Sequence, residues 1–161
     1  MAERFPGRFR GLLIAGEDEH GRAMKDAARA GAQALVKPLG YLSQEAVARI
    51  ASTVSWNLVV EADMAESPFL PSKFADCAVS GKPILAITPP KSEIRSLFCE
   101  YGGGIAVSND ATEIVAGIVE LLSSGRIAAP TNGTLSARFT ADSIVKAYRD
   151  MFCKVRETAR C

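Results

Sequence analysis

The sequence predicts an α/β fold in which a parallel sheet of five strands is covered by helices on both faces. Continuous apolar runs of strand length alternate along the chain with amphipathic stretches of helical period. The runs are apolar throughout, which is typical of strands buried on both faces of a parallel sheet. Right-handed crossovers between such strands give a doubly wound, Rossmann-like sheet with the order 2-1-3-4-5. The whole chain, residues 1–161, is predicted to form one domain.

Turn-forming residues bound the apolar runs and so mark where each strand ends. Gly16 follows the first run, and Pro89 follows the fourth. The third run is followed by a long loop, at the place where α/β folds bind ligands. The expected strands are residues 9–16, 33–38, 57–62, 84–88 and 105–108.

Capping residues precede the amphipathic stretches and predict where the helices begin. Ser43 and Ser72 can each accept hydrogen bonds from first-turn amides. Asp110 and Glu113 have the spacing of a capping box. Gly81 is expected to end its helix, because glycine adopts the left-handed conformation at low cost. The expected helices are residues 44–53, 72–80, 91–101 and 110–125, together with a helix from 17 or 18 to 31 and one from 140 or 142 to 152.

The last part of the chain, residues 139–161, is expected to be a closing helix followed by a polar tail. It comes after a turn-rich linker at 126–138. Its apolar side chains recur at helical spacing, so they are expected to face the core. They are Ile144, Val145, Tyr148, Met151 and Phe152.

Composition predicts a cytoplasmic globular protein. Of the 161 residues, 48% are hydrophobic and 23% are charged, and the net charge of +1 gives no bias toward nucleic acid or anionic membranes. No apolar run reaches the length of a transmembrane helix, and the first residues lack the apolar segment of a secretory signal. The four cysteines are widely spaced and there is one histidine, so neither a disulfide framework nor a metal site is expected. Without a dinucleotide or Walker A fingerprint, no cofactor is expected either.

The residues from 67 to 88 carry the strongest functional signal. The loop at 63–72 leads into the helix that Ser72 is expected to cap and that ends at Gly81. Lys73 and Asp76 lie three residues apart, on one face of its first turn. A helix amino end binds anions through free amides and the helix dipole. A lysine at this position would hold a phosphate, and the carboxylate could accept hydrogen bonds from sugar hydroxyls.

This stretch resembles the donor-sugar signature of retaining GT-B glycosyltransferases of family 4. The resemblance implies that Lys73 lies close to the donor phosphates and that Asp76 replaces the glutamate that holds the ribose. Cys77 replaces the usual aromatic residue. The first acid of the family's motif would fall on Pro68, and Glu66 is a candidate substitute. The run that carries the resemblance is Pro71-Ser72-Lys73-Phe74-Ala75-Asp76-Cys77-Ala78-Val79-Ser80-Gly81-Lys82-Pro83.

Further segments resemble the carboxyl-terminal, donor-binding half of that family, in the family's order. The resemblance implies a hexosyltransferase-type domain that binds a UDP- or GDP-sugar. The amino-terminal acceptor domain and the first donor-domain strand have no counterpart, so the domain is expected to be truncated. Transfer would then need an acceptor-domain chain or a homo-oligomer. The matching segments are residues 12–16, 39–46, 55–60, 102–110 and 139–152.

The resemblance and the predicted loops together give the candidate site. No catalytic residue and no metal ligand is assigned. Gly40 and Tyr41 fall where the family flanks the nucleotide base, and Gly16 forms the turn after the first strand. The candidate substrate-binding residues are Glu66, Ser67, Ser72, Lys73, Asp76, Gly16, Gly40 and Tyr41.

Two other classes of protein are alternatives. A non-catalytic interaction subunit would keep this fold after losing donor binding. A receiver-like signalling domain has the same strand order and would use Glu17, Asp18, Asp63 and Thr88. It also needs a lysine after the fifth strand, where this chain has Ser108-Asn109-Asp110-Ala111.

Overall fold

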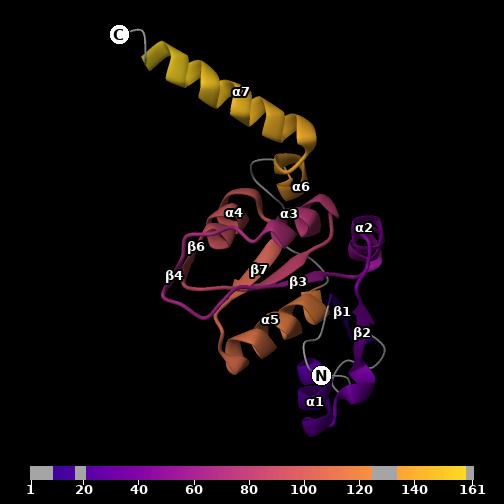
Figure 1. Ribbon diagram of the computed structural model, residues 1–161. Coiled ribbons are helices and arrows are strands. Elements are labelled where there is room, and N and C mark those ends of the chain that lie inside the picture. Colours follow the sequence, from indigo (N-terminus) through magenta and orange to yellow (C-terminus); the bar gives the residue numbers. More distant parts are fainter. Residues whose placement is uncertain (1–8, 17–20, 125–133, 159–161) are drawn as a thin grey trace. The chain divides into compact units, whose positions relative to one another are not determined.

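A computed structural model describes residues 9–16, 21–124 and 134–158 (Figure 1). The chain divides into two compact units, Met1–Ile50 and Ala51–Cys161. The start of the helix expected at residue 17 or 18 and most of the expected linker at 126–138 lie outside the described residues. Each unit contains its own parallel sheet.

The first unit is a two-stranded parallel sheet with short helical segments. Leu12 of one strand is paired with Val36 of the other. At the ends of the two strands, the amide of Gly16 donates to the carbonyl oxygen of Gly40 at 2.9 Å. The elements are β1 (Leu12–Ala15), α1 (Arg22–Arg29), η2 (Gln33–Leu35) and β2 (Val36–Gly40), and α2 (Gln44–Thr53) runs across the boundary between the units.

The second unit contains a three-stranded parallel sheet with the order β3-β5-β7. The strands are in register, so that Asn57, Ile84 and Gly104 are neighbours across the sheet. All three strands therefore end at one edge. The elements are β3 (Asn57–Val60), α3 (Ser72–Val79), β5 (Ile84–Ile87), α4 (Glu93–Tyr101), β7 (Gly104–Val107) and α5 (Ala111–Ser124).

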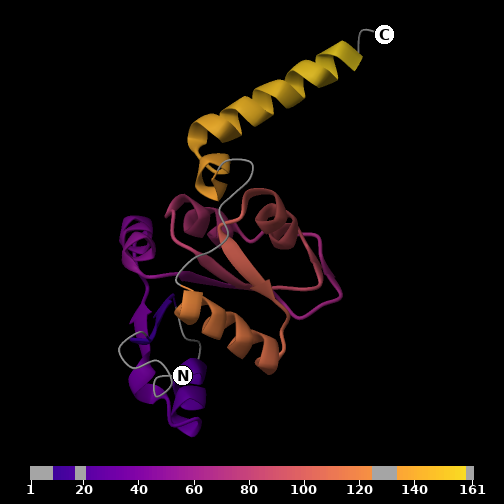
Figure 2. The ribbon, with the colours of Figure 1, turned by 180° about the vertical axis from the view of Figure 1, so that it is seen from behind.

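Helices cover both faces of this sheet, as the apolar strands predict. Helices α3 and α4 pack on one face, where Phe74, Ile84 and Ile94 are fully buried. Helix α5 packs on the other face around Leu85 and Val107. Figures 1 and 2 show α5 on the opposite side of the sheet from α3 and α4. The α/β class with parallel strands and helices on both faces is confirmed.

The single five-stranded sheet is not confirmed. The predicted neighbours 2-1 and 3-4-5 form separate parallel sheets, β1-β2 and β3-β5-β7. A third sheet pairs β4 (Glu66–Ser67) with β6 (Lys91–Ser92). The sequence did not predict it, because a two-residue strand is too short to show a period.

Two helix starts differ from the prediction, and the predicted capping box is only half formed. Ser72 is the first residue of α3, which follows Pro71 and has no side-chain cap. The helix expected from residue 91 begins at Glu93, because Ser92 is extended and caps it. In the predicted capping box, Asp110 accepts from the amide of Glu113 at 3.0 Å. The carboxylate of Glu113, however, accepts from the amide of Ser108 at 2.9 Å.

The carboxyl-terminal segment also differs. Thr134 caps a short helix, α6 (Leu135–Arg138), inside the expected linker. Helix α7 (Ala141–Thr158) follows, but its apolar stripe is exposed, and Phe152 is 61% accessible. The element that α7 contacts most is the four-residue α6, which is too small to cover the stripe. No helix in the described part of the chain has the length and apolar character needed to cross a membrane.

Candidate functional site

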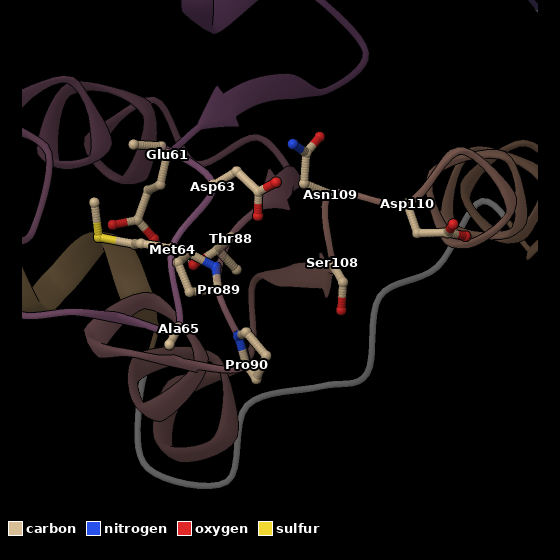
Figure 3. Close-up of a pocket in the computed structure, with 11 residues that line it drawn as sticks. Glu61, Asp63, Met64, Ala65, Thr88, Pro89, Pro90, Ser108, Asn109 and Asp110 are labelled. Carbon is tan, nitrogen blue, oxygen red and sulfur yellow. Dashed lines mark hydrogen bonds between the residues drawn. The ribbon is translucent and has the colours of Figure 1, made fainter.

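A cavity of about 510 Å³ lies at the carboxyl ends of the three parallel strands. Segments that follow β3, β5 and β7 form its walls, as Figure 3 shows. This is the edge at which open α/β sheets bind ligands. The lining residues are Glu61, Ala62, Asp63, Met64, Ala65, Thr88, Pro89, Pro90, Ser108, Asn109 and Asp110.

The charge of this cavity favours hydroxyl groups over phosphates. Glu61, Asp63 and Asp110 contribute carboxylates, and none of the described lining residues is basic. The Asp110 carboxylate is already used, because it accepts from the amides of Thr112 and Glu113 at 2.8 and 3.0 Å. The hydrogen bond from the Ser108 amide lowers the pKa of Glu113. Carboxylates only accept hydrogen bonds, so sugar hydroxyls suit them and a diphosphate does not.

Glu61 is the centre of a polar network beneath this cavity. Its Oε1 accepts from the hydroxyl of Ser67 at 2.7 Å, and its Oε2 accepts from the hydroxyl of Thr88. The hydroxyls of Thr88 and Ser92 are 2.7 Å apart. All three hydroxyl-bearing residues are buried. The network joins the segments that follow β3 and β5.

A second cavity, of about 630 Å³, lies beside the small β4-β6 sheet. The candidate residues Glu66 and Ser67 line it together with Lys91 and Arg95. The Arg95 guanidinium donates to the carbonyl oxygens of Pro89 at 2.8 Å and of Thr88 at 3.3 Å. It also donates to a carbonyl of β7 at 3.3 Å. These hydrogen bonds join the segment that follows β5 to β7.

The amino end of α3 is open to solvent. Lys73 and Asp76 are exposed in the first turns, whereas Phe74 between them is fully buried. Neither Lys73 nor Asp76 is among the described residues that line the two cavities. Burial and the nearby charge of Asp76 raise the pKa of the Cys77 thiol. The start of α3 is thus an accessible helix end with one cation in its first turn.

The remaining candidate residues belong to the first unit. Gly16 and Gly40 are hydrogen-bonded neighbours at the carboxyl ends of β1 and β2. Both have positive φ angles, 117° and 69°, which favour glycine. The side chain of Tyr41 follows directly and is 80% exposed. The structure therefore brings these three residues together at one end of the β1-β2 sheet.

Sequence reasoning missed Glu61 and Arg95 as organising residues. Asp63 and Thr88, which the receiver-like alternative selects, both line the first cavity. Its other two residues, at positions 17 and 18, lie outside the described part of the chain. Within the described residues, no three His, Cys, Asp or Glu side chains are placed to hold a metal ion. Glu61 and Ser67 are only six residues apart, so a hydrogen bond between them within the loop could have been considered from the sequence.

The chain is a Rossmann-like α/β protein with a cavity at the carboxyl ends of the strands β3, β5 and β7. The chain is similar to Anabaena HepE, which was crystallised in complex with UDP, with 16% identity and a TM-score of 0.60. The match covers 91% of this chain but only 41% of HepE. No protein-family model matches the sequence, and a search of curated proteins finds no match. At this identity the likeness shows the fold.

Proposed function

We propose that this chain is the donor-binding domain of a GT-B, family 4-like glycosyltransferase and holds a nucleotide-sugar through its diphosphate. The observation that carries the proposal is the open amino end of α3, with no side-chain cap and with Lys73 exposed in its first turn. The likeness of the fold to UDP-bound HepE supports a UDP-sugar as the preferred donor. A GDP-sugar is the alternative donor.

The proposed chemistry is electrostatic. An uncapped helix end offers amide groups and the positive end of the helix dipole to an anion. Lys73 adds a full charge at the same place. A unit charge pair at 4 Å contributes about 1 kcal/mol in water and about 4 kcal/mol near a protein surface. The same groups would stabilise the nucleotide diphosphate as it leaves during glycosyl transfer.

The other candidate residues have secondary roles in this proposal. Asp76 accepts from the ribose hydroxyls, and Ser72 contributes to the phosphate site. Glu66 and Ser67, which line the second cavity, would face the sugar in this proposal. In the first unit, Gly16, Gly40 and Tyr41 would contact the nucleotide, with Tyr41 against the base.

Transfer would need groups beyond those described for this chain. The chain spans about two fifths of the length of HepE. We propose that an acceptor domain on another chain, or a homo-oligomer, completes the enzyme. The domain would work as a hexosyltransferase-type unit in the cytoplasm.

Isothermal calorimetry with UDP tests the proposal. Wild-type protein should bind UDP, and Lys73→Ala should weaken binding at least about fivefold, which corresponds to roughly 1 kcal/mol. Lys146→Ala is the matched control, because it removes an exposed lysine from α7. Absence of binding by the wild type, or an equal loss in both variants, would refute the proposal.

A non-catalytic interaction subunit is the second candidate. The exposed apolar stripe of α7 favours it, since Tyr148 and Phe152 are each more than half exposed. This candidate predicts self-association that Phe152→Glu abolishes, together with no heat of UDP binding. Sedimentation velocity over a range of protein concentrations measures the first property.

A further inference from the structure

We infer that Glu61 is a positioning residue that holds the β3–α3 loop (residues 61–71) in the conformation that presents the amino end of α3 to its ligand. The loop's fixed path follows from the structure alone. Its effect on nucleotide affinity rests on the function proposed above.

The β3–α3 loop is tied down at its beginning, middle and end. It begins at Glu61, which follows β3 directly. At its middle, Ser67 is buried and belongs to the small sheet in which β4 pairs with β6. Near its end, Leu70 packs against the core cluster that contains Phe74. Glu61 links the first of these points to the second through its hydrogen bond with Ser67.

The directions of the hydrogen bonds make the Glu61 carboxylate the final acceptor. A hydroxyl carries one proton, so Thr88 gives its proton to Glu61 and accepts one from Ser92. Ser67 lies 2.7 Å from Glu61 and 3.2 Å from the carbonyl oxygen of Phe69, so the carboxylate is its better acceptor. Hydrogen bonds to a carboxylate are stronger than those between neutral groups.

The network extends from the loop to the start of α4. Ser92, at its far end, accepts from the amide of Arg95 at 3.3 Å and so caps α4. Thr88 follows β5 directly and is 2% exposed. Glu61 therefore fixes the loop to two elements that are themselves held by the sheet. Removing its carboxylate leaves the buried hydroxyl groups of Ser67 and Thr88 without their shared acceptor.

A loosened loop would lower nucleotide affinity without removing any ligand contact. Helix α3 begins directly after the loop, and Lys73 is its second residue. The orientation of the α3 amino end therefore depends on the loop. When only a fraction of molecules has the competent conformation, the apparent dissociation constant rises by the inverse of that fraction. A population of about one tenth thus weakens binding about tenfold.

Hydrogen exchange and UDP calorimetry on the full chain test the inference with the variants Glu61→Ala and Glu61→Gln. In Glu61→Ala, the amides of residues 62–70 should exchange about tenfold faster, and UDP should bind about tenfold more weakly. In Glu61→Gln, the exchange rates and the UDP affinity should both stay within about twofold of the wild-type values, because an amide can accept from Thr88 and donate to Ser67. Asp142→Asn, an exposed acid on α7, is the control.

The two measurements separate the inference from the proposed function. Unchanged exchange in Glu61→Ala would overturn the inference, whatever the protein binds. Faster exchange with no UDP binding by the wild type would support the positioning role and refute the nucleotide site. Should Glu61→Ala fail to fold, Ser67→Ala removes one arm of the network, and it must also speed exchange across 62–70. Failure of Ser67→Ala to do so would overturn the inference.

Discussion

Replacing Phe74 by alanine should strongly destabilise the protein while leaving the exposed face of α3 intact. Phe74 is completely buried, and its ring lies 5.8 Å from that of Phe98 and 5.7 Å from that of Phe139. Truncation of a buried phenylalanine typically costs about 3–5 kcal/mol. This is a large part of the roughly 5–15 kcal/mol by which domains are stable. Phe74 therefore joins α3 to α4 and to the segment after α6.

Urea denaturation followed by circular dichroism measures this cost. Val79→Ala is the matched control, because Val79 lies on the same helix and is 54% exposed. Its effect should stay within about 0.5 kcal/mol, as for most surface substitutions. Midpoints shifted equally by the two substitutions would show that α3 does not pack as described and would refute the reasoning.

Three further outcomes are expected. Gly104→Ala should destabilise the sheet by about 1–3 kcal/mol in a urea titration, because its new Cβ would lie 2.6 Å from the carbonyl oxygen of Ile84; an unchanged midpoint would contradict the close packing. The hydrogen bond from the Ser108 amide lowers the pKa of Glu113, so the ionised carboxylate stabilises the folded protein. This contribution to the free energy of unfolding is complete above the usual pKa near 4.5 and is lost as pH falls through the lower pKa of the folded state. Glu113→Gln should therefore flatten the acid side of the plot of unfolding free energy against pH, and an unaltered plot would contradict this. With Ellman's reagent at pH 8, Cys77 should react more slowly than the exposed cysteines of α4 and α7, because its pKa is raised and its side chain is partly buried; equal rates would contradict its placement.

Much of the second unit could be predicted from local sequence. The runs that form β3, β5 and β7 are apolar apart from Asn57, which predicts strands of a parallel sheet. Strand β5 is buried in that sheet, whereas Leu58 and Val60 of β3 are exposed. Gly81 follows α3 with a φ of 69°, as a glycine after a helix should. Asp110 caps α5 as its spacing indicated. In these cases the residues that determine the structure are close together in the chain.

What could not be predicted depends on partners distant in sequence. From local sequence Glu61 is only a polar residue at the end of a strand, because Thr88, its second partner, lies 27 residues away. Arg95 lies in the first turn of α4, and nothing local indicates that it donates to the carbonyl oxygen of Ala106 in β7. The stripe of α7 has the period of a core helix, but a period does not show which element will cover it.

The central claim is that a nucleotide diphosphate binds at the amino end of α3, and an amide-resolved NMR titration with UDP tests it most directly. We expect the largest saturable shifts at the amides of Ser72, Lys73 and Phe74, with smaller shifts in the β3–α3 loop. A titration that leaves these amides unmoved, or that shifts only residues lining the cavity at the ends of β5 and β7, would contradict the account.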